Sequence, residues 1–233
     1  MAMPIPPPPC APRSGRAPVL RSPRSRGLCR AAPRGFPAPG AASPLPSDPL
    51  EELCLACGLC CDGTLFDEVR LEPGDDAARL RALGLPLKFP RARQPVGRFP
   101  QPCAALGADC TCRLYAERPR QCRVFECGVY KKTKAGELDP AAALRLVRRG
   151  RRLADRVRRL LRRLGDADEH RALGERFFRM QCRMEEERPG PEALATFADL
   201  SLAVHQLKLL TQERFYTRSS DSSAPPKATW RED

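Results

Sequence analysis

The sequence predicts a mainly α-helical protein with irregular loops, in which a small cysteine-cluster metal-binding domain precedes a C-terminal region of about three helices. Two observations lead to this fold class. Nine of the 12 cysteines lie between residues 54 and 127, in a loop-rich stretch with a thin apolar core. From residue 140 onward, apolar residues recur every three or four positions, which is the period of an amphipathic helix.

Composition divides the 233 residues into four segments. Residues 1–46 are rich in Pro and Arg and contain too few large apolar residues to offset the entropy of ordering, so we expect a disordered leader. We expect the metal-binding domain over residues 47–135 and the helical region over residues 136–217. Residues 218–233 are polar and are expected to form a disordered tail.

A helix start signal opens the metal-binding segment. Asp48 suits the N-cap, and Pro49 suits the first helical position. The helix is expected to carry Cys54 and Cys57. Gly58 is expected to end or loosen it, because glycine readily adopts the backbone conformation of a C-terminal cap.

The next stretch predicts short elements joined by loops. Residues 64–71 predict a strand, and a helix is expected to start at residues 73–76 and to run through Leu83. Residues 86–102 are rich in proline and predict a loop, with a strand near Phe89.

The helical region is expected to contain three helices, over about 140–164, from there to Glu187, and from Pro191 to about Phe215. Gly and Pro residues separate them. Their predicted inward-facing residues are Leu144, Val147, Leu153, Val157, Leu160, Leu161 and Leu164 in the first, Leu173, Phe177, Met180 and Met184 in the second, and Leu194, Phe197, Leu200, Val204, Leu207 and Leu210 in the third.

The cysteine spacing predicts metal binding, because a C-x-x-C turn places two sulfurs on one ion. Adjacent Cys60 and Cys61 project in different directions, so one tetrahedral ion cannot easily use all four cysteines of the first run. Two hypotheses remain, namely two metal sites or one cluster with a spare thiol. The candidate ligands are Cys54, Cys57, Cys60, Cys61, Cys103, Cys110, Cys112, Cys122 and Cys127.

The expected metal is zinc or iron, including an iron–sulfur cluster, because thiolates accept these and spacing does not choose among them. His170 and His205 both fall in predicted helices, which favours an all-thiolate shell. No secretory signal or membrane-spanning run is found, so we expect a cytoplasmic protein with unpaired thiols rather than a disulfide framework. The alternative interpretation of the acid-free leader is an organelle transit peptide.

The net charge of +13 is concentrated in two places. Residues 1–47 carry seven arginines and no acid, and residues 144–163 carry ten arginines and one acid. An arginine-rich helix of this kind can grip phosphates or an anionic membrane. We favour a bundle helix whose solvent face uses arginine and pairs with acids of the next helix, and the lack of interleaved aromatic residues makes nucleic acid the less favoured partner.

Other basic residues lie close to the late cysteines. Four of them are interleaved with those cysteines and either offset thiolate charge or are solvated, namely Arg113, Arg118, Arg120 and Arg123. A turn is expected before Cys122. Lys131, Lys132 and Lys134 are expected to form a solvated connecting loop.

The cysteine motifs also carry a family resemblance. They read Cys54-x-x-Cys57-Gly58-x-Cys60-Cys61, then Pro102-Cys103-x-x-Leu106, then Cys110-x-Cys112-x-x-Tyr115-x-x-Arg118-Pro119-x-x-Cys122-Arg123-x-Phe125. Over about residues 50–130 this pattern resembles the YkgJ-type cysteine-cluster family. The resemblance implies a zinc- or iron-chelating domain with ligands at the matching cysteines, and Cys127 lies just past the shared motif. A related motif occurs in a flagellin lysine methylase.

The sequence therefore predicts a metal-binding protein that holds zinc or iron through clustered thiolates, with a structural or metal-handling role. Two alternatives stay open. One is an iron–sulfur or metal-dependent enzyme that acts on proteins, in the manner of a methylase. The other is a zinc-stabilised nucleic-acid binder that uses the arginine-rich helix. No catalytic residue is assigned, and the metal ion is the one partner that the pattern specifies.

Overall fold

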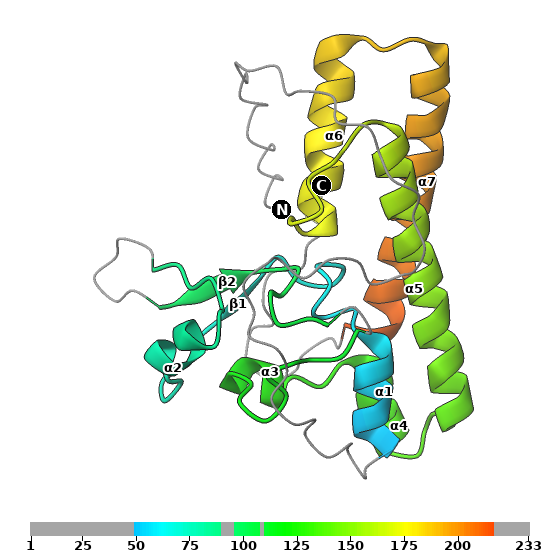
Figure 1. Cartoon of the computed structure of the whole chain (residues 1–233). Coiled ribbons are helices and arrows are strands. Elements are labelled where there is room, and N and C mark those ends of the chain that lie inside the picture. Colours follow the sequence, from blue (N-terminus) through cyan, green and yellow to red (C-terminus); the bar gives the residue numbers. More distant parts are fainter. Residues whose placement is uncertain (1–48, 90–95, 108–109, 217–233) are drawn as a thin grey trace, which may run out of the picture.

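The computed structural model describes residues 49–89, 96–107 and 110–216. Within these ranges the protein is mainly α-helical with irregular loops, as predicted, and it has seven helices and a two-stranded sheet. Figure 1 shows three long helices beside a lower region of short helices, strands and loops. The predicted leader and tail, together with Cys10 and Cys29, lie outside the described residues.

The first helix, α1, spans Pro49–Cys57 and carries the first two cysteines of the block. It ends as the sequence predicts. Gly58 has a φ of +65°, a conformation that residues with a Cβ rarely adopt. The backbone N–H groups of Cys61 and Asp62 then donate to the Gly58 carbonyl at 2.9 and 3.0 Å. The chain therefore turns sharply after the helix, in the middle of the cysteine run.

A small sheet follows, at one side of the molecule (Figure 1). Strand β1, Glu68–Arg70, pairs antiparallel with β2, Arg98–Pro100. The predicted strand over 64–71 is thus shortened to its C-terminal part. The prediction of a strand near Phe89 is wrong by a few residues, because the chain there makes only an isolated bridge between Lys88 and Arg98.

Three further short helices complete the lower region. Helix α2, Ala77–Ala82, begins where expected, and the Asp76 side chain accepts a hydrogen bond from the Arg79 N–H at 2.8 Å. Helix α3, Arg120–Val124, replaces the predicted turn. The predicted loop of three lysines is wrong, because those residues lie on α4, Gly128–Lys134.

The start of α4 explains the missed helix. Its N-cap is Cys127, whose Sγ accepts a hydrogen bond from the Tyr130 N–H at 3.4 Å. The usual N-cap residues are Ser, Thr, Asp and Asn, so a cysteine cap carries no recognised start signal. The cap also places a cysteine sulfur at the point where the long helices meet the loops.

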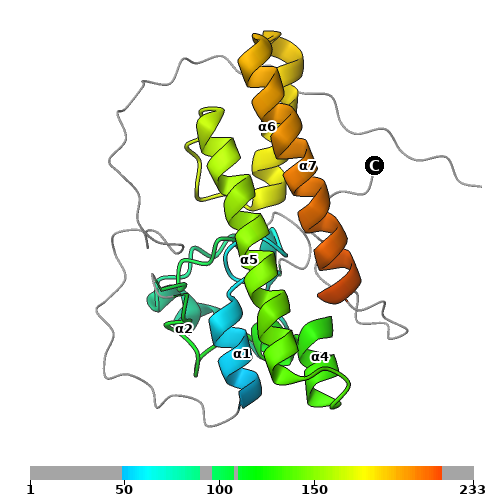
Figure 2. The ribbon, with the colours of Figure 1, turned by 90° about the vertical axis from the view of Figure 1, so that its right-hand side faces the viewer.

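The three predicted long helices are confirmed as α5, Pro140–Arg163, α6, Leu173–Glu187, and α7, Pro191–Arg214. The Asp139 side chain caps α5 by accepting from the Ala142 N–H at 2.9 Å. Helix α5 packs along α7, and its other end lies against α1 and α4 (Figure 2). The long helices therefore cover the cysteine-bearing region directly.

The apolar interior forms two clusters. The larger one, which we call the helix core, joins residues from the long helices to residues that flank the first cysteines. Its members include Leu59, Leu65, Val157, Leu161, Met180, Leu207 and Phe215. The smaller one, the loop core, lies between the sheet, α2 and the loops, and consists of Val69, Leu71, Leu80, Leu85, Phe99, Ala105 and Leu114.

One predicted core position is wrong. Leu194 is 50% exposed, although the other apolar residues predicted for α7 are buried or half-buried. Helix α7 carries leucines on both faces, since Leu202 and Leu209 are also exposed. Periodicity alone cannot select the inner face of a helix that is apolar on two sides.

The end of α7 is anchored to the start of α4. The Gly128 N–H donates to the Phe215 carbonyl at 2.8 Å, and Phe215 is buried in the helix core. A Cβ at Gly128 would lie 2.6 Å from the Arg214 carbonyl oxygen, which is a backbone atom and cannot rotate away. The helical region and the cysteine region thus share packed backbone, and the division at residue 135 stays a prediction.

We expect Gly128→Ala to destabilise the protein by about 2 kcal/mol, because the added methyl group forces this junction apart. The free energy of unfolding in urea measures the effect. Gly190→Ala is the matched control, because a Cβ there meets nothing within 4 Å and should cost less. Equal losses in the two variants would contradict the close approach of α4 and α7.

Candidate metal centre

The structure brings the predicted cysteines together. All nine line one cavity of about 140 Å³ that lies between the loop region and the long helices. They come from α1, the turn after it, the loops that follow β2, α3 and the N-cap of α4. Segments separated by more than 70 positions along the chain therefore meet at a single place.

Eight of the nine are present as reduced thiols, namely Cys54, Cys57, Cys60, Cys61, Cys103, Cys112, Cys122 and Cys127. Cys110 is disulfide-bonded, and so is Cys182 on α6, so the expectation of unpaired thiols is wrong for these two cysteines. The Cys110 Sγ lies 3.1 Å from a guanidinium nitrogen of Arg151. Cys110 lines the cavity without offering a thiol, and its role as a ligand stays a prediction.

The eight thiols divide into two sets of four. The first thiol group is Cys54, Cys57, Cys60 and Cys127. The pKa of Cys60 is raised by its proximity to Cys127, Cys57 and Cys54, and also by its sequence neighbour Cys61, and Cys127 and Cys54 raise the pKa of Cys57. Three members, Cys57, Cys60 and Cys127, pack against the helix core. Packing therefore places Cys57, Cys60 and Cys127 together, and Cys54 joins them through its proximity to Cys57 and Cys60.

The second thiol group is Cys61, Cys103, Cys112 and Cys122. The charges of the other three members each raise the pKa of Cys61, and those of Cys103 and Cys112 raise that of Cys122. The Cys103 N–H also donates to the Cys61 carbonyl at 2.7 Å. Three members, Cys103, Cys112 and Cys122, pack against the loop core instead of the helix core.

The boundary between the groups falls between neighbours in the sequence. Cys60 belongs to the first group and Cys61 to the second. Cys60 packs against the helix core, whereas the thiol with the largest effect on the pKa of Cys61 is Cys103 of the second group.

Burial sets the protonation of the seven thiols other than Cys54, which is exposed. Desolvation is the largest influence on each of these seven, and it raises the pKa of Cys103 and of Cys122 to about 12. It also raises the pKa of Cys57, Cys60 and Cys61 well above the ordinary value. The thiols are therefore neutral at pH 7 in the metal-free protein, and a metal ion that binds them displaces their protons.

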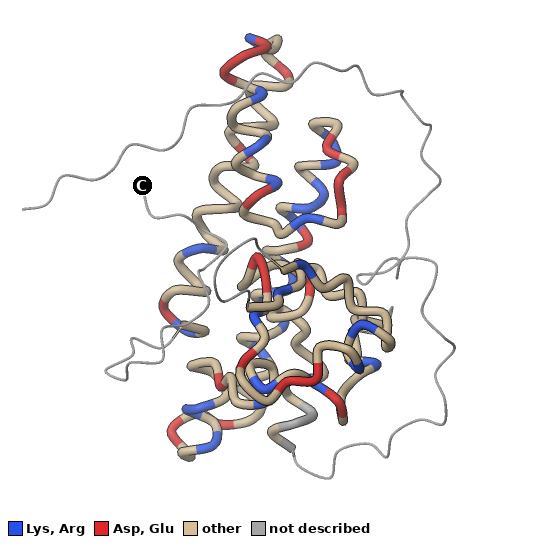
Figure 3. The backbone as a smooth tube through the Cα atoms, turned by 90° about the vertical axis from the view of Figure 1, so that its left-hand side faces the viewer, with Lys and Arg blue, Asp and Glu red and all other residues tan. Residues whose placement is uncertain are grey.

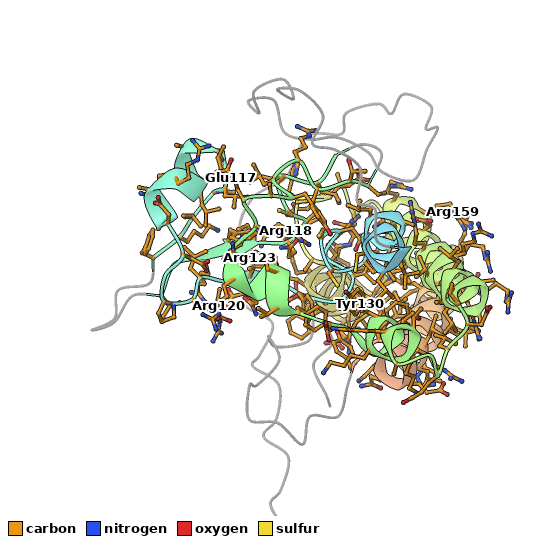
Figure 4. The ribbon with its side chains drawn as sticks, turned by 90° about the horizontal axis from the view of Figure 1, so that it is seen from below. Glu117, Arg118, Arg120, Arg123, Tyr130 and Arg159 are labelled. Carbon is orange, nitrogen blue, oxygen red and sulfur yellow. The ribbon has the colours of Figure 1, made fainter. Side chains whose placement is uncertain are left out.

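Positive charge reaches the second thiol group from Arg118, whose proximity lowers the pKa of Cys112 and Cys122 against the effect of burial. The Arg118 guanidinium stacks on the Tyr115 ring at 3.6 Å, and its Nε donates to the Tyr115 carbonyl at 2.9 Å. In Figure 4, Arg118 lies among the loops beside α3. Arg120, by contrast, pairs with Glu72 away from the sulfurs.

Sequence reasoning missed two arginines of α5 that turn inward. Arg151 donates to the Ala56 carbonyl at 2.6 Å. Arg158 forms an ion pair with Asp62, next to Cys61, at 2.9 Å and another with Asp155 at 3.3 Å. Both arginines flank the apolar stripe of α5, and their spacing of seven residues is the only signal in the sequence that could have identified them.

The donor set suits a thiolate metal centre, since two sets of four sulfurs match the all-cysteine tetrahedral sites that bind zinc. The sulfurs are grouped but not yet arranged around an ion. In the described parts of the chain, no three His, Cys, Asp or Glu side chains are placed to hold one metal.

Comparison with known families agrees with the motifs. Residues 53–141 match the CxxCxxCC family, described as "Putative zinc- or iron-chelating domain". This segment is a CxxCxxCC domain. The match contains all nine candidate cysteines and is consistent with the YkgJ-type resemblance. Searches of curated proteins and of solved structures each found no match.

The CxxCxxCC domain indicates that the chain chelates zinc or iron and uses metal as a cofactor. The described helices include none that is long and apolar enough to cross a membrane. The two histidines lie exposed on the helical region and outside the cavity. Cysteine side chains are thus the most numerous metal-binding groups in the lining of the cavity.

Arg158→Leu is expected to destabilise the protein by about 3 kcal/mol, because it leaves Asp62 and Asp155 without their cation in a buried place. Thermal or urea unfolding measures the change. Arg162→Leu on the same helix is the control. Its ion pair with Glu169 is solvent-exposed, so we expect a loss below about 1 kcal/mol.

Alkaline pH is expected to destabilise the metal-free protein but not the metal-loaded one. The unfolded thiols lose their protons near pH 9, whereas folded Cys103 and Cys122 keep theirs to about pH 12. Stability should therefore be complete below pH 9 and should fall as the pH rises toward 12. Metal-bound thiolates have no proton to lose. Urea midpoints at several pH values, with reductant and with or without chelator, test this. The same alkaline loss in both forms would contradict thiol ligation.

Proposed function

We propose that this protein holds two zinc or iron ions, one in each thiol group, and that the ions have a structural role. The observation that carries the proposal is that three thiols pack against the helix core and three others against the loop core, with Cys54 close to the first three and Cys61 close to the second three. Four thiolates complete a tetrahedral shell and leave no open position, which is the pattern of structural rather than catalytic sites.

The second ion would stabilise the loop core. It contains seven buried residues, too few to stabilise a folded unit against the entropy of ordering its loops. A metal held by Cys61, Cys103, Cys112 and Cys122 would join the turn after α1, the loops after β2, and α3. Its binding free energy would then contribute directly to folding.

The first ion would act at the junction with the long helices. Its ligands come from α1, the turn that follows α1, and the N-cap of α4. A metal there would fix the two helices that pack against α5. The cytoplasm is the compartment we propose, since its reducing conditions keep such thiols available to metal.

Each proposed metal site needs positive charge close to it. One divalent ion with four thiolates carries a net charge of −2, which a small interior must offset. Arg118 stands beside the second group and Arg151 binds the end of α1 beside the first. Donors of this kind around a metal site stabilise the thiolates by charge and hydrogen bonding.

We expect the protein to purify with two metal equivalents per chain. Cys57→Ser and Cys103→Ser should each retain one, because each removes a ligand from a different group. Elemental analysis after anaerobic purification measures this, with Cys29→Ser as a control that keeps both. Loss of all metal in both variants would instead indicate one shared cluster.

The visible spectrum of the same samples distinguishes zinc from an iron–sulfur cluster, and thereby the structural role from the enzyme hypothesis. A colourless protein with zinc supports the structural role. A brown protein that absorbs broadly near ~400 nm would contain an iron–sulfur cluster and would favour the enzyme hypothesis.

A further inference from the structure

The outer face of α5 carries a row of arginines that the metal sites do not use. The arginine stripe consists of Arg145, Arg149, Arg152, Arg156, Arg159 and Arg163. All but Arg156 are exposed, and Arg156 is half-buried. Arg159 lies at the outer edge of the helix in Figure 4.

Helix geometry places the stripe opposite the core. The buried stripe of α5 runs through Ala143, Val147, Gly150, Ala154, Val157 and Leu161. Each stripe arginine follows one of these residues by two positions, and two positions on an α-helix correspond to a rotation of about 200°. The spacings of four and three alternate without a break, so the row extends along about 27 Å of one face.

The stripe has no charge partner in the protein's described ranges. Three other arginines of α5 are engaged, since Arg151 and Arg158 bind the cysteine region and Arg162 pairs with Glu169. None of the six stripe side chains forms an ion pair or hydrogen bond with another described residue.

The expected pairing of this helix with the acids of the next one therefore fails for the stripe. Asp166 pairs with Arg176, and Asp168 pairs with Arg171 and Arg179. Asp166 and Asp168 thus neutralise arginines on α6 or just before it, and Glu169 pairs with Arg162, which is outside the stripe. In Figure 3, which shows the opposite side of the molecule, acidic and basic residues are interspersed. The excess positive charge of the described region is concentrated on α5.

The residue types on this face indicate which kind of polyanion the stripe can bind. The exposed large apolar residues of the described chain lie on other elements and not on α5, so the face lacks the apolar side chains that insert into a membrane interface. The helix also has no aromatic residue to stack on the bases of a single strand. It has no Asn or Gln to pair with adenine edges.

We propose that the arginine stripe binds the phosphate backbone of double-stranded nucleic acid without reading its sequence. Guanidinium groups form paired hydrogen bonds with phosphate oxygens, and each neutralised phosphate releases a condensed counterion. Six guanidiniums lie in one row and have no ion-pair partner among the described residues. They can therefore contact successive phosphates while the packing of the core stays unchanged.

The experiment measures binding of the full-length, metal-loaded chain to a fluorescent duplex of mixed sequence by anisotropy, between 50 and 200 mM salt. The test variant carries Arg149→Gln, Arg152→Gln and Arg159→Gln. The control variant carries Arg70→Gln, Arg79→Gln and Arg120→Gln, which removes the same charge from surface arginines of the other region. Arginines of residues 1–47 are present in all three proteins, so their contribution cancels.

Loss of three phosphate contacts should lower the slope of log affinity against log salt by about 2.7, and the affinity at 50 mM salt by at least about tenfold. The control should keep the wild-type slope. A third variant with lysine at the three test positions should retain most of the binding, because it keeps the charge.

Several results would overturn the proposal. These are no duplex binding by the wild type at 50 mM salt, equal slopes in the test and control variants, or tighter stripe-dependent binding to phosphatidylserine vesicles or to single strands than to duplex. Metal content and helical circular dichroism of the test variant identify a folding defect, and in that case Arg145→Gln with Arg163→Gln at the ends of the stripe decides the question.

Discussion

The convergence of eight thiols on one cavity, seven of them half-buried, is the constraint on which the lower half of this molecule depends. A neutral buried thiol packs as a small apolar group and stabilises little by itself. The seven residues of the loop core cannot compensate for so many ordered loops. The division of the thiols between two apolar clusters resolves this difficulty, because each set can tie its own cluster together once it holds an ion.

Helix α5 relates the cysteine region to the rest of the protein through three faces. Its apolar stripe packs on α7 and the helix core. At the edge of this stripe, Arg151 and Arg158 bind the Ala56 carbonyl and the Asp62 carboxylate, which lie beside the first cysteines. Its outer face carries the arginine stripe. Arginine therefore has two different roles on one helix, according to the angle at which its side chain leaves the axis, and the apolar residues occupy the third face.

Much of this arrangement could be predicted from the sequence, and the failures have identifiable causes. Helices α5 to α7 follow from periodicity and from Gly and Pro breaks, because long amphipathic segments carry a repeated signal. Helix α4 was missed because its cap is a sulfur atom of Cys127. The cysteines of the cavity were predicted together, but their division could not be, since it depends on which core each loop packs against. The inward turn of Arg158 likewise depends on Asp62, a residue 96 positions away.

The position of Cys60 next to Cys61 has a thermodynamic consequence. On the two-ion proposal, a single peptide bond joins a ligand of one ion to a ligand of the other, and their Cα atoms are about 3.8 Å apart. Whichever ion binds first immobilises that dipeptide and removes conformational freedom that the other ion would otherwise have to remove. The two affinities are then coupled through backbone entropy, and half-loaded molecules become scarce relative to empty and full ones.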